Sequence, residues 1–270
     1  MLDKKPIITL TTDFGLKDPF AGLMKAVILG INPEAKLIDI THNISRHNVF
    51  EASQVLAMSY KYFPPATIHA AVVDPGVGGA RRPLLVITED HYFIGPDNGI
   101  FTAVFEKEQS GFFKVLNITA SHYFLPMSGS TFHGRDVFAP VAAWLSKGVD
   151  SHKFGKQITD YHKISIPSPV LSDGDTIKGE VVSFDNFGNA ISNITLEFLS
   201  KSRPADSLSN FKIIFRDRRV PLLNYYSEAK DHSLCAVINS FGRLELFANK
   251  DSAAEKFDIR IGDGVIITIA

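Results

Sequence analysis

The first half of the chain alternates between short apolar runs and longer amphipathic stretches. The apolar runs predict strands, of which the last two form a β pair, at residues 8–13, 36–42, 67–74, 84–90 and 91–96. The amphipathic stretches predict helices at residues 18–31, 49–63, 99–108 and 137–148. Strands separated by helices of this length form βαβ units. We therefore expect an α/β domain whose largely parallel or mixed central sheet is flanked by helices.

The pattern changes near Ser165. The segment ISIPSPV is broken by prolines in the manner of a linker, and short strands separated by Gly turns follow it, at residues 175–185, 211–215, 233–240, 243–249 and 263–270. This spacing is typical of a small antiparallel sheet or barrel. We therefore expect two domains, an α/β domain at residues 1–164 and a smaller C-terminal antiparallel β domain at residues 165–270.

Composition excludes several classes of partner. The chain has 28 Lys and Arg against 29 Asp and Glu, a formal net charge of −1, so we expect neither nucleic acid nor an anionic membrane as a partner. No apolar run approaches the roughly 18 residues of a membrane span, and no signal peptide is indicated. The single cysteine, Cys235, lies in an apolar run, which predicts a buried thiol in a cytoplasmic protein.

Polar side chains follow several predicted strands at Gly-rich turns, where α/β enzymes commonly carry their chemistry. Asp13 ends the first strand and can accept the two hydroxyls of a ribose or cap the following helix, a task for which Asp18 is better placed. The turn DPGVGG at Asp74 is compatible with a phosphate site but matches no phosphate-loop motif. Arg81 is close enough in sequence to fold back onto Asp74, and we expect one of the two neighbouring arginines, Arg81 and Arg82, to be a solvated surface charge.

The segment TFHGRD supplies a third polar group. His133 precedes a predicted helix, Gly134 gives access to it, and Asp136 is positioned to cap that helix. A lone histidine is more often structural than catalytic, an expectation that extends to His42, His47, His69 and His122. The chain has no spacing typical of a metal site, no GxSxG elbow and no context for a catalytic cysteine. Asp, Arg and His without such groups point to water as the nucleophile.

Two turns in the second half carry amide, carboxylate and aromatic groups. In SFDNFGN, Asp185 can pair with an ammonium group, Phe187 can stack on a base and Asn189 can bond its edge. Phe241 and Asn249 offer similar contacts. Each turn is also compatible with an ordinary β-turn.

Six motifs occur in order along the chain: TTDFG, VVDPGVGxxR, PDNG, STFHGRDVFAP, FDNFGN and INSFG. Together they resemble the S-adenosyl-L-methionine (SAM) hydroxide adenosyltransferase family, once known as DUF62, whose relatives include fluorinase and chlorinase. The resemblance implies hydrolysis of SAM to adenosine and L-methionine without a cofactor or metal. It also implies a C-terminal domain that completes the adenine and methionine pocket, and a homotrimer with active sites between subunits.

The resemblance also implies roles for individual residues. The catalytic trio falls on Asp74, Arg81 and His133. The implied substrate-binding residues are Asp13 for the ribose hydroxyls, His47 near the ribose, Thr131, Asp185 for the amino group, Phe187 and Phe241 for stacking, Asn189 and Asn249 for the base, and Ser240 for the methionine carboxylate. Whether Asp74 or His133 takes the proton from water is left open.

The positions at which this chain differs from the halogenating relatives favour water as the nucleophile. Fluorinase has tyrosines at the positions of Asp74 and His133, and a serine for the halide at the position of Gly134. Free water has a pKa of about 15.7, so a site that orients and activates it is required for attack on the ribose C5′. Two alternatives remain, a halide-using adenosyl transferase of the chlorinase kind and a non-catalytic adenosine or SAM-binding protein.

Overall fold

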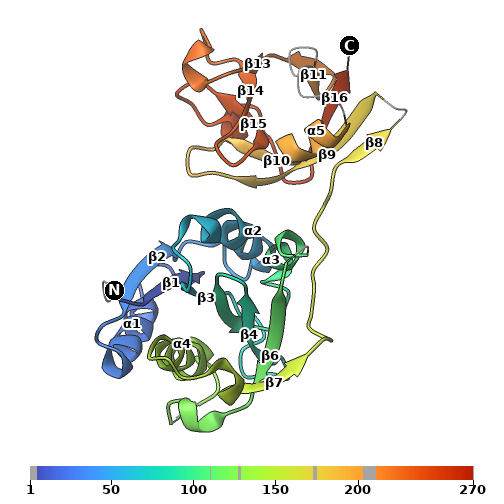
Figure 1. Cartoon of the computed structure of the whole chain (residues 1–270). Coiled ribbons are helices and arrows are strands. Elements are labelled where there is room, and N and C mark those ends of the chain that lie inside the picture. Colours follow the sequence, from blue (N-terminus) through green and yellow to red (C-terminus); the bar gives the residue numbers. More distant parts are fainter. Residues whose placement is uncertain (1–4, 110, 127–128, 173–174, 203–210, 270) are drawn as a thin grey trace. The chain divides into compact units, whose positions relative to one another are not determined.

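The computed structural model describes residues 5–109, 111–126, 129–172, 175–202 and 211–269 (Figure 1). The chain folds into two compact units, Met1–Ile166 and Pro167–Ala270. The sequence pattern predicts this boundary between residues 164 and 165. Each unit is described by itself.

The N-terminal unit is built on a seven-stranded mixed sheet with the strand order β2-β1-β3-β5-β4-β6-β7. Strands β2, β1, β3 and β5 are parallel, whereas β4 and β6 continue the sheet with antiparallel pairing, as does β7 at the edge. The bounds are β1 Ile7–Thr12, β2 Lys36–Thr41, β3 Ile68–Val72, β4 Pro83–Thr88, β5 Tyr92–Pro96, β6 Phe113–Ile118 and β7 Gly155–Ile158.

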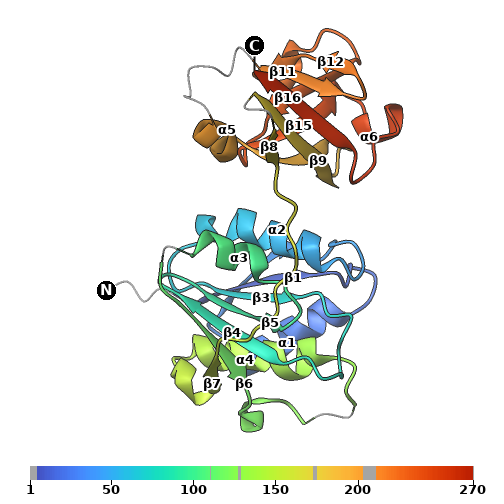
Figure 2. The same ribbon diagram turned by 90° about the vertical axis from the view of Figure 1, so that its right-hand side faces the viewer.

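Helices cover both faces of this sheet, which confirms the predicted α/β architecture. Figure 2 shows α2 and α3 on one face and α1 and α4 on the other. Separate apolar clusters fill the two spaces between helices and sheet. The bounds are α1 Phe20–Ile31, α2 Val49–Ser59, α3 Thr102–Lys107 and α4 Ala139–Ser146, with short 3₁₀ turns at Tyr60–Tyr62, Ser121–Tyr123 and Ser151–Lys153 and a π-helical turn at Gly134–Phe138.

Two strands of this sheet escape prediction because they lack a continuous apolar run. In β6 the apolar residues alternate with Lys114 and Asn117, and β7 has the sequence GKQI at the sheet edge. Gly155 is required there, because a Cβ would lie 1.7 Å from the carbonyl oxygen of Asn117.

The side-chain cap predicted for the start of the first helix is absent. Helix α1 begins after Pro19, with no side-chain cap from Asp18 or Asp13.

The C-terminal unit is a nearly closed, barrel-like sheet, as predicted. Its strand path is β12-β11-β16-β9-β10-β15-β14-β13, with β8 also paired to β9, and the two ends of the path adjoin. Pairing is antiparallel except between β13 and β14. The bounds are β8 Val170–Ser172, β9 Thr176–Phe184, β10 Ala190–Thr195, β11 Phe211–Phe215, β12 Arg218–Val220, β13 Leu222–Leu223, β14 Leu234–Ile238, β15 Arg243–Ala248 and β16 Gly264–Ile269, with helices α5 Leu196–Ser202 and α6 Ala253–Lys256 and a 3₁₀ turn at Tyr226–Glu228.

The parallel strands β1 and β3 are neighbours and end at the same sheet edge, so Asp13 and Asp74 follow them side by side in the topology. The loop after β3 turns at Gly78, whose φ is +77°. A Cβ at Gly78 would lie 2.6 Å from the carbonyl oxygen of Ser130. The glycine therefore lets the loop that carries Arg81 pack against the segment that carries His133.

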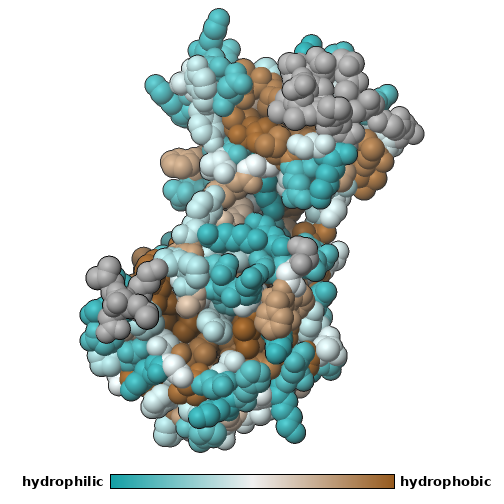
Figure 3. Space-filling model, in the orientation of Figure 1, coloured by the Kyte–Doolittle hydropathy of each residue, from teal (hydrophilic) through white to brown (hydrophobic). Residues whose placement is uncertain are grey.

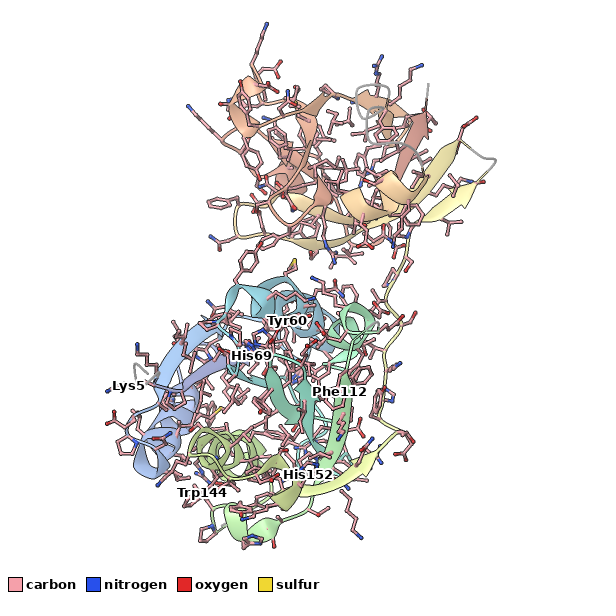
Figure 4. All side chains as sticks on the ribbon, in the orientation of Figure 1. Lys5, Tyr60, His69, Phe112, Trp144 and His152 are labelled. Carbon is pink, nitrogen blue, oxygen red and sulfur yellow. The ribbon has the colours of Figure 1, made fainter. Side chains whose placement is uncertain are left out.

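A buried cluster of aromatic and imidazole rings lies under α2. His69 is fully buried, forms a 2.8 Å hydrogen bond with Thr9 Oγ1, and lies 5.1 Å from the Phe93 ring in a stacked arrangement. Tyr60 packs edge-on against it (Figure 4). Burial, with a smaller contribution from His91, lowers the pKa of His69 to about 3. His69 is therefore neutral in the folded chain and has the structural role expected of it.

We predict that Gly78→Ala destabilises the fold more than Gly148→Ala does. Both glycines have positive φ, but a Cβ at Gly148 has nothing within 4 Å. The control therefore carries only the backbone strain of about 1–2 kcal/mol, whereas Gly78→Ala adds a backbone clash. Urea unfolding of both variants measures the difference, and equal losses would contradict the role given to Gly78.

We also predict that protonation of His69 opposes folding in acid. Because its folded pKa is below its unfolded value, the unfolded chain binds the proton more tightly and stability falls as pH drops below about 6.5. The contribution between pH 7 and pH 5 is about 2 kcal/mol. Denaturant titrations at both pH values should show this loss for the natural chain and for a control variant of the exposed His152, His152→Gln. The loss should be smaller in His69→Gln.

Candidate active site in two pockets

The first pocket lies in the N-terminal unit at the carboxyl edge of the parallel strands. It is a cavity of about 260 Å³ lined by Asp13, Phe14, Phe20, Arg46, His47, Val72, Asp74, Val77, Thr131, Phe132, His133 and Gly134. All the residues that the sequence motifs place at the ribose and the reacting carbon line it, except Arg81. Arg81 reaches the pocket through its hydrogen bonds.

Arg81 joins Asp74 to His133. Its Nε donates to Asp74 Oδ1 at 3.0 Å, and its Nη2 donates to Asp74 Oδ2 and also to His133 Nδ1, the latter at 2.7 Å. A guanidinium group only donates hydrogen bonds. Nδ1 of His133 is therefore the unprotonated ring nitrogen, and the proton of the neutral imidazole is on Nε2.

The surroundings keep this imidazole neutral. Burial lowers the pKa of His133, and the positive charge of Arg81 lowers it further against the smaller opposing effect of Asp74. The Arg81 guanidinium also lies 5.3 Å from the Phe138 ring centre. Its Nη1 is buried and has no hydrogen-bond partner within the described ranges. Arg81 is thus a fixed cation with donor capacity beyond its two partners.

The segment around His133 is positioned by a π-helical turn, Gly134–Phe138, of the kind that often marks functional sites. Gly134 is buried, and a Cβ there would lie 3.1–3.3 Å from Phe132, Met24 and Phe14. It makes room for this packing rather than opening access to His133. The predicted cap is also wrong, because Asp136 lies inside the π turn and pairs with Arg135 at 2.6 Å.

Neither Arg81 nor Arg82 is the solvated surface charge expected of one of them, because Arg82 is paired as well. It pairs with Asp97 at 2.7 Å and with Asp160 at 2.9 Å. The PDNG motif supplies Asp97, and the next residue, Asn98, donates to the carbonyl of Val73 just before Asp74. This motif therefore supports the strand end that carries the carboxylate.

Asp13 is tied to the loop opposite it. Its Oδ2 accepts a hydrogen bond from the backbone N–H of His47 at 2.9 Å. His47 has a φ of +64°, a strained value for a residue with a side chain. Arg46, which no sequence motif indicated, also lines the pocket. So do three mutually packed rings, Phe14, Phe20 and Phe132, whose centres lie 5.1–5.8 Å apart.

The second pocket lies in the C-terminal unit and has a volume of about 920 Å³. It brings together all six residues predicted in this half, namely Asp185, Phe187, Asn189, Ser240, Phe241 and Asn249. The Phe187 ring is 75% exposed and that of Phe241 is 52% exposed. Two large exposed rings beside a carboxylate form a surface suited to a flat, partly cationic ligand.

Some polar groups of this pocket already bond the protein. Asp185 Oδ1 accepts from the backbone N–H groups of Phe187 and Asn189, and its Oδ2 accepts from Asn189 Nδ2, all at 2.9 Å. Asn249 Nδ2 donates to the Ala229 carbonyl at 2.8 Å. Both asparagines thus use their amide nitrogens within the protein, whereas their amide oxygens bond no other group in the described ranges and are available to a ligand.

The lining residues that were not anticipated include three with polar side chains that bond one another, Tyr226, Asn239 and Glu245. Tyr226 follows no motif. Glu245 had a usable signal, because an acidic residue between the apolar residues of RLELFA is unusual for a buried strand. Among the residues that the structure describes, no group of His, Cys, Asp and Glu forms a metal site. No helix in the described ranges is long and apolar enough to cross a membrane.

Comparison with known proteins places these features in a family. Relatives include the (R)-S-adenosyl-L-methionine hydrolase of Methanocaldococcus jannaschii, which is 35% identical over 97% of this chain and 95% of its own length. A fluorinase of an Actinoplanes species is 23% identical over 98% of both chains.

A solved structure has the same fold. The crystal structure of an uncharacterised conserved protein from Thermotoga maritima superposes with a TM-score of 0.87 at 33% identity, over 97% of this chain and 99% of its own. Residues 8–155 match the N-terminal domain model of SAM hydroxide adenosyltransferases, and residues 179–266 match the C-terminal domain model. The chain therefore belongs to the SAM hydroxide adenosyltransferase family.

Proposed function

We propose that this protein hydrolyses SAM to adenosine and L-methionine, with water as the attacking group. The partly buried Asp74–Arg81–His133 network in a small pocket beside Asp13 carries the proposal. The relatives named (R)-S-adenosyl-L-methionine hydrolase, at 31–35% identity, support it, and their name makes the (R) epimer at sulfur the substrate to test.

The reaction needs activation on one side only. The water oxygen forms a bond to the ribose C5′ while the C5′–S bond breaks and its electron pair goes to sulfur. The sulfonium thereby becomes the neutral thioether of methionine, so the leaving group needs no acid. The attacking water must lose one proton. Holding it in line with C5′ supplies part of the roughly 7–11 kcal/mol that proximity can contribute.

The hydrogen bonds among Asp74, Arg81 and His133 support the following roles around this water. Nδ1 of His133 is already engaged by Arg81, so Nε2–H orients water as a donor. Asp74 is the remaining group of the network that can accept the proton. It takes the proton as the C–O bond forms, because the water becomes more acidic at that stage. The charge of Arg81 stabilises the developing oxyanion.

The substrate-binding residues divide between the two pockets. In the N-terminal pocket, Asp13 holds the ribose hydroxyls, with His47 and Thr131 beside it. In the C-terminal pocket the remaining residues hold the base and the amino acid, with Phe187 and Phe241 stacking, Asn189 and Asn249 bonding the base, Asp185 pairing with the ammonium and Ser240 bonding the carboxylate.

Halide transfer is the weaker alternative. A halide site built on a serine at position 134 would require a side chain where Phe132, Met24 and Phe14 already approach within 3.1–3.3 Å of the Cβ position. A cation that is bonded to Asp74 and His133 also suits water more than a bare halide ion, because both partners can orient a proton.

The protein is further proposed to act as a homotrimer in the cytoplasm, with each active site between subunits. Exposed apolar residues next to the N-terminal pocket support an interface there, with Leu16 76% exposed and Phe20 and Leu23 also at the surface. Apolar side chains are visible on the surface of both units in Figure 3. Cys235 is a buried free thiol, which suits a reducing compartment.

The central experiment is incubation of the purified chain with (R)-SAM in ¹⁸O-water. We expect adenosine whose 5′-hydroxyl carries the label, because the water oxygen bonds to C5′. Unlabelled adenosine, or binding of SAM without adenosine release, would overturn the hydrolysis. A chloride-dependent product would instead favour halide transfer.

Two neighbouring arginines provide a matched pair of variants for the same assay. Arg81→Lys loses the bidentate bond to Asp74 and the bond to His133, so kcat should fall about 100-fold or more. Arg82→Lys makes the same chemical change at a residue that pairs with Asp97 and Asp160, outside the pocket, and should leave kcat unchanged. Similar losses in both variants would mean that the network acts only through stability.

The assembly is tested by light scattering of the full chain. We expect a mass near three times 29.7 kDa, and a Leu16→Glu variant should dissociate because it places a charge in the apolar interface. A natural chain of single-subunit mass would contradict the trimer.

A further inference from the structure

Glu245 is an unusual residue in the C-terminal pocket. It lies on β15 with only 2% of its surface exposed, between apolar residues that belong to the barrel core. A carboxylate is rarely buried unless it is paired or hydrogen-bonded, because removing it from water costs several kcal/mol. Its partners indicate what it does.

Both carboxylate oxygens of Glu245 accept hydrogen bonds from residues that line the same pocket. Tyr226 donates its hydroxyl to Oε1 at 2.9 Å, and Asn239 donates its Nδ2 to Oε2 at 3.0 Å. Tyr226 is in turn packed edge-on against Phe247, with ring centres 4.9 Å apart. The carboxylate therefore joins the wall that carries Tyr226 to the hairpin between β14 and β15.

The side chain of Asn239 also bonds the backbone of the hairpin turn. Its Oδ1 accepts from the backbone N–H groups of Phe241 and Arg243, at 3.0 and 3.1 Å. The turn is closed by the backbone bond from Gly242 N–H to the Asn239 carbonyl at 2.9 Å. Ser240 and Phe241 stand at its tip. One side chain thus fixes the two residues proposed to meet the methionine carboxylate and the base.

We infer that Glu245 is a positioning residue, whose buried carboxylate holds Asn239 and Tyr226 and thereby fixes the turn that presents Ser240 and Phe241 to the substrate. The inference deepens the proposed function and rests on it for the identity of the ligand. Glu245 touches no reacting atom in this scheme. Its loss should therefore weaken substrate binding more than it slows the chemical step.

Local electrostatics fit a carboxylate retained for its hydrogen bonds. Burial, and to a smaller extent the nearby charge of Asp185, raise the pKa of Glu245. Burial and the contact with Glu245 raise the pKa of Tyr226 to about 12, so the phenol remains a donor. Burial thus disfavours the charged form of Glu245, and the hydrogen bonds from Asn239 and Tyr226 oppose this effect on its pKa.

The experiment compares two substitutions of Glu245. Glu245→Leu leaves the Asn239 amide and the Tyr226 hydroxyl without their partner, so KM for (R)-SAM should rise about 10-fold or more with kcat within about 3-fold. Glu245→Gln removes the charge but can still accept from Asn239, while its amide donates to a Tyr226 hydroxyl that turns round. It should therefore restore KM to nearly the natural value.

Two further variants complete the test. Glu255→Leu makes the same change at an exposed glutamate of α6 outside the pocket and should leave KM unchanged. Asn239→Ala should raise KM alone but add little in the Glu245→Leu background, because both act through one connection. This double-mutant cycle tests the connection even if Glu245→Leu is less stable. If the two substitutions raised KM only through a general loss of stability, their effects on KM would be additive.

Several outcomes would overturn the inference. An unchanged KM in Glu245→Leu would remove the positioning role, and an equal rise in Glu245→Gln would mean that the charge acts rather than the hydrogen bonds. Calorimetric binding of (R)-SAM separates this from failure of the proposed function. A natural chain that binds SAM without hydrolysing it contradicts hydrolysis, while the Kd values of the variants still decide the role of Glu245.

Discussion

The arrangement of the N-terminal pocket depends on one cation. Arg81 bonds a carboxylate on one side and an imidazole nitrogen on the other, and these partners come from segments more than fifty residues apart in sequence. A buried guanidinium without such partners would be strongly unfavourable. The same bonds that stabilise its charge also determine which nitrogen of His133 carries a proton. Folding and the proposed reaction therefore both require Arg81 to keep these two partners.

Much of this site could be read from the sequence because its residues follow strongly patterned elements. Asp13 and Asp74 end two apolar strands, and parallel strands bring their carboxyl ends to one edge. The pattern of strands and turns does not show which of the neighbouring residues Arg81 and Arg82 bonds Asp74. Their difference depends on Asp97 and Asp160, which come from distant turns with no periodic pattern. The capping roles suggested for Asp18 and Asp136 failed because Pro19 and a π-helical turn stand at those positions.

The C-terminal pocket shows a different limit. Its recognisable residues stand on Gly turns, where polar side chains attract notice, and all six line one cavity. Glu245 and Tyr226 shape the same cavity from a strand and a 3₁₀ turn. A related limit applies to strands β6, β7 and β10, none of which the apolar pattern predicts, because their polar residues interrupt the alternation that marks a half-buried strand. These polar residues can be buried because they bond partners that are distant in sequence. A local sequence pattern does not contain those partners.

The anchoring of Arg82 also defines where the N-terminal unit ends. Asp97 accepts a hydrogen bond from the backbone of His162 at 2.7 Å, and Ile164 N–H donates to Thr102 at 3.0 Å. Gly99 leaves room for this segment, since a Cβ there would lie 2.5 Å from the Ile164 side chain. The peptide beyond the last strand is thus a covering layer rather than a tether. An excised N-terminal unit must include residues up to 166, because a fragment ending at Ile158 would lack Asp160, His162 and Ile164, which bond the loops beside its pocket.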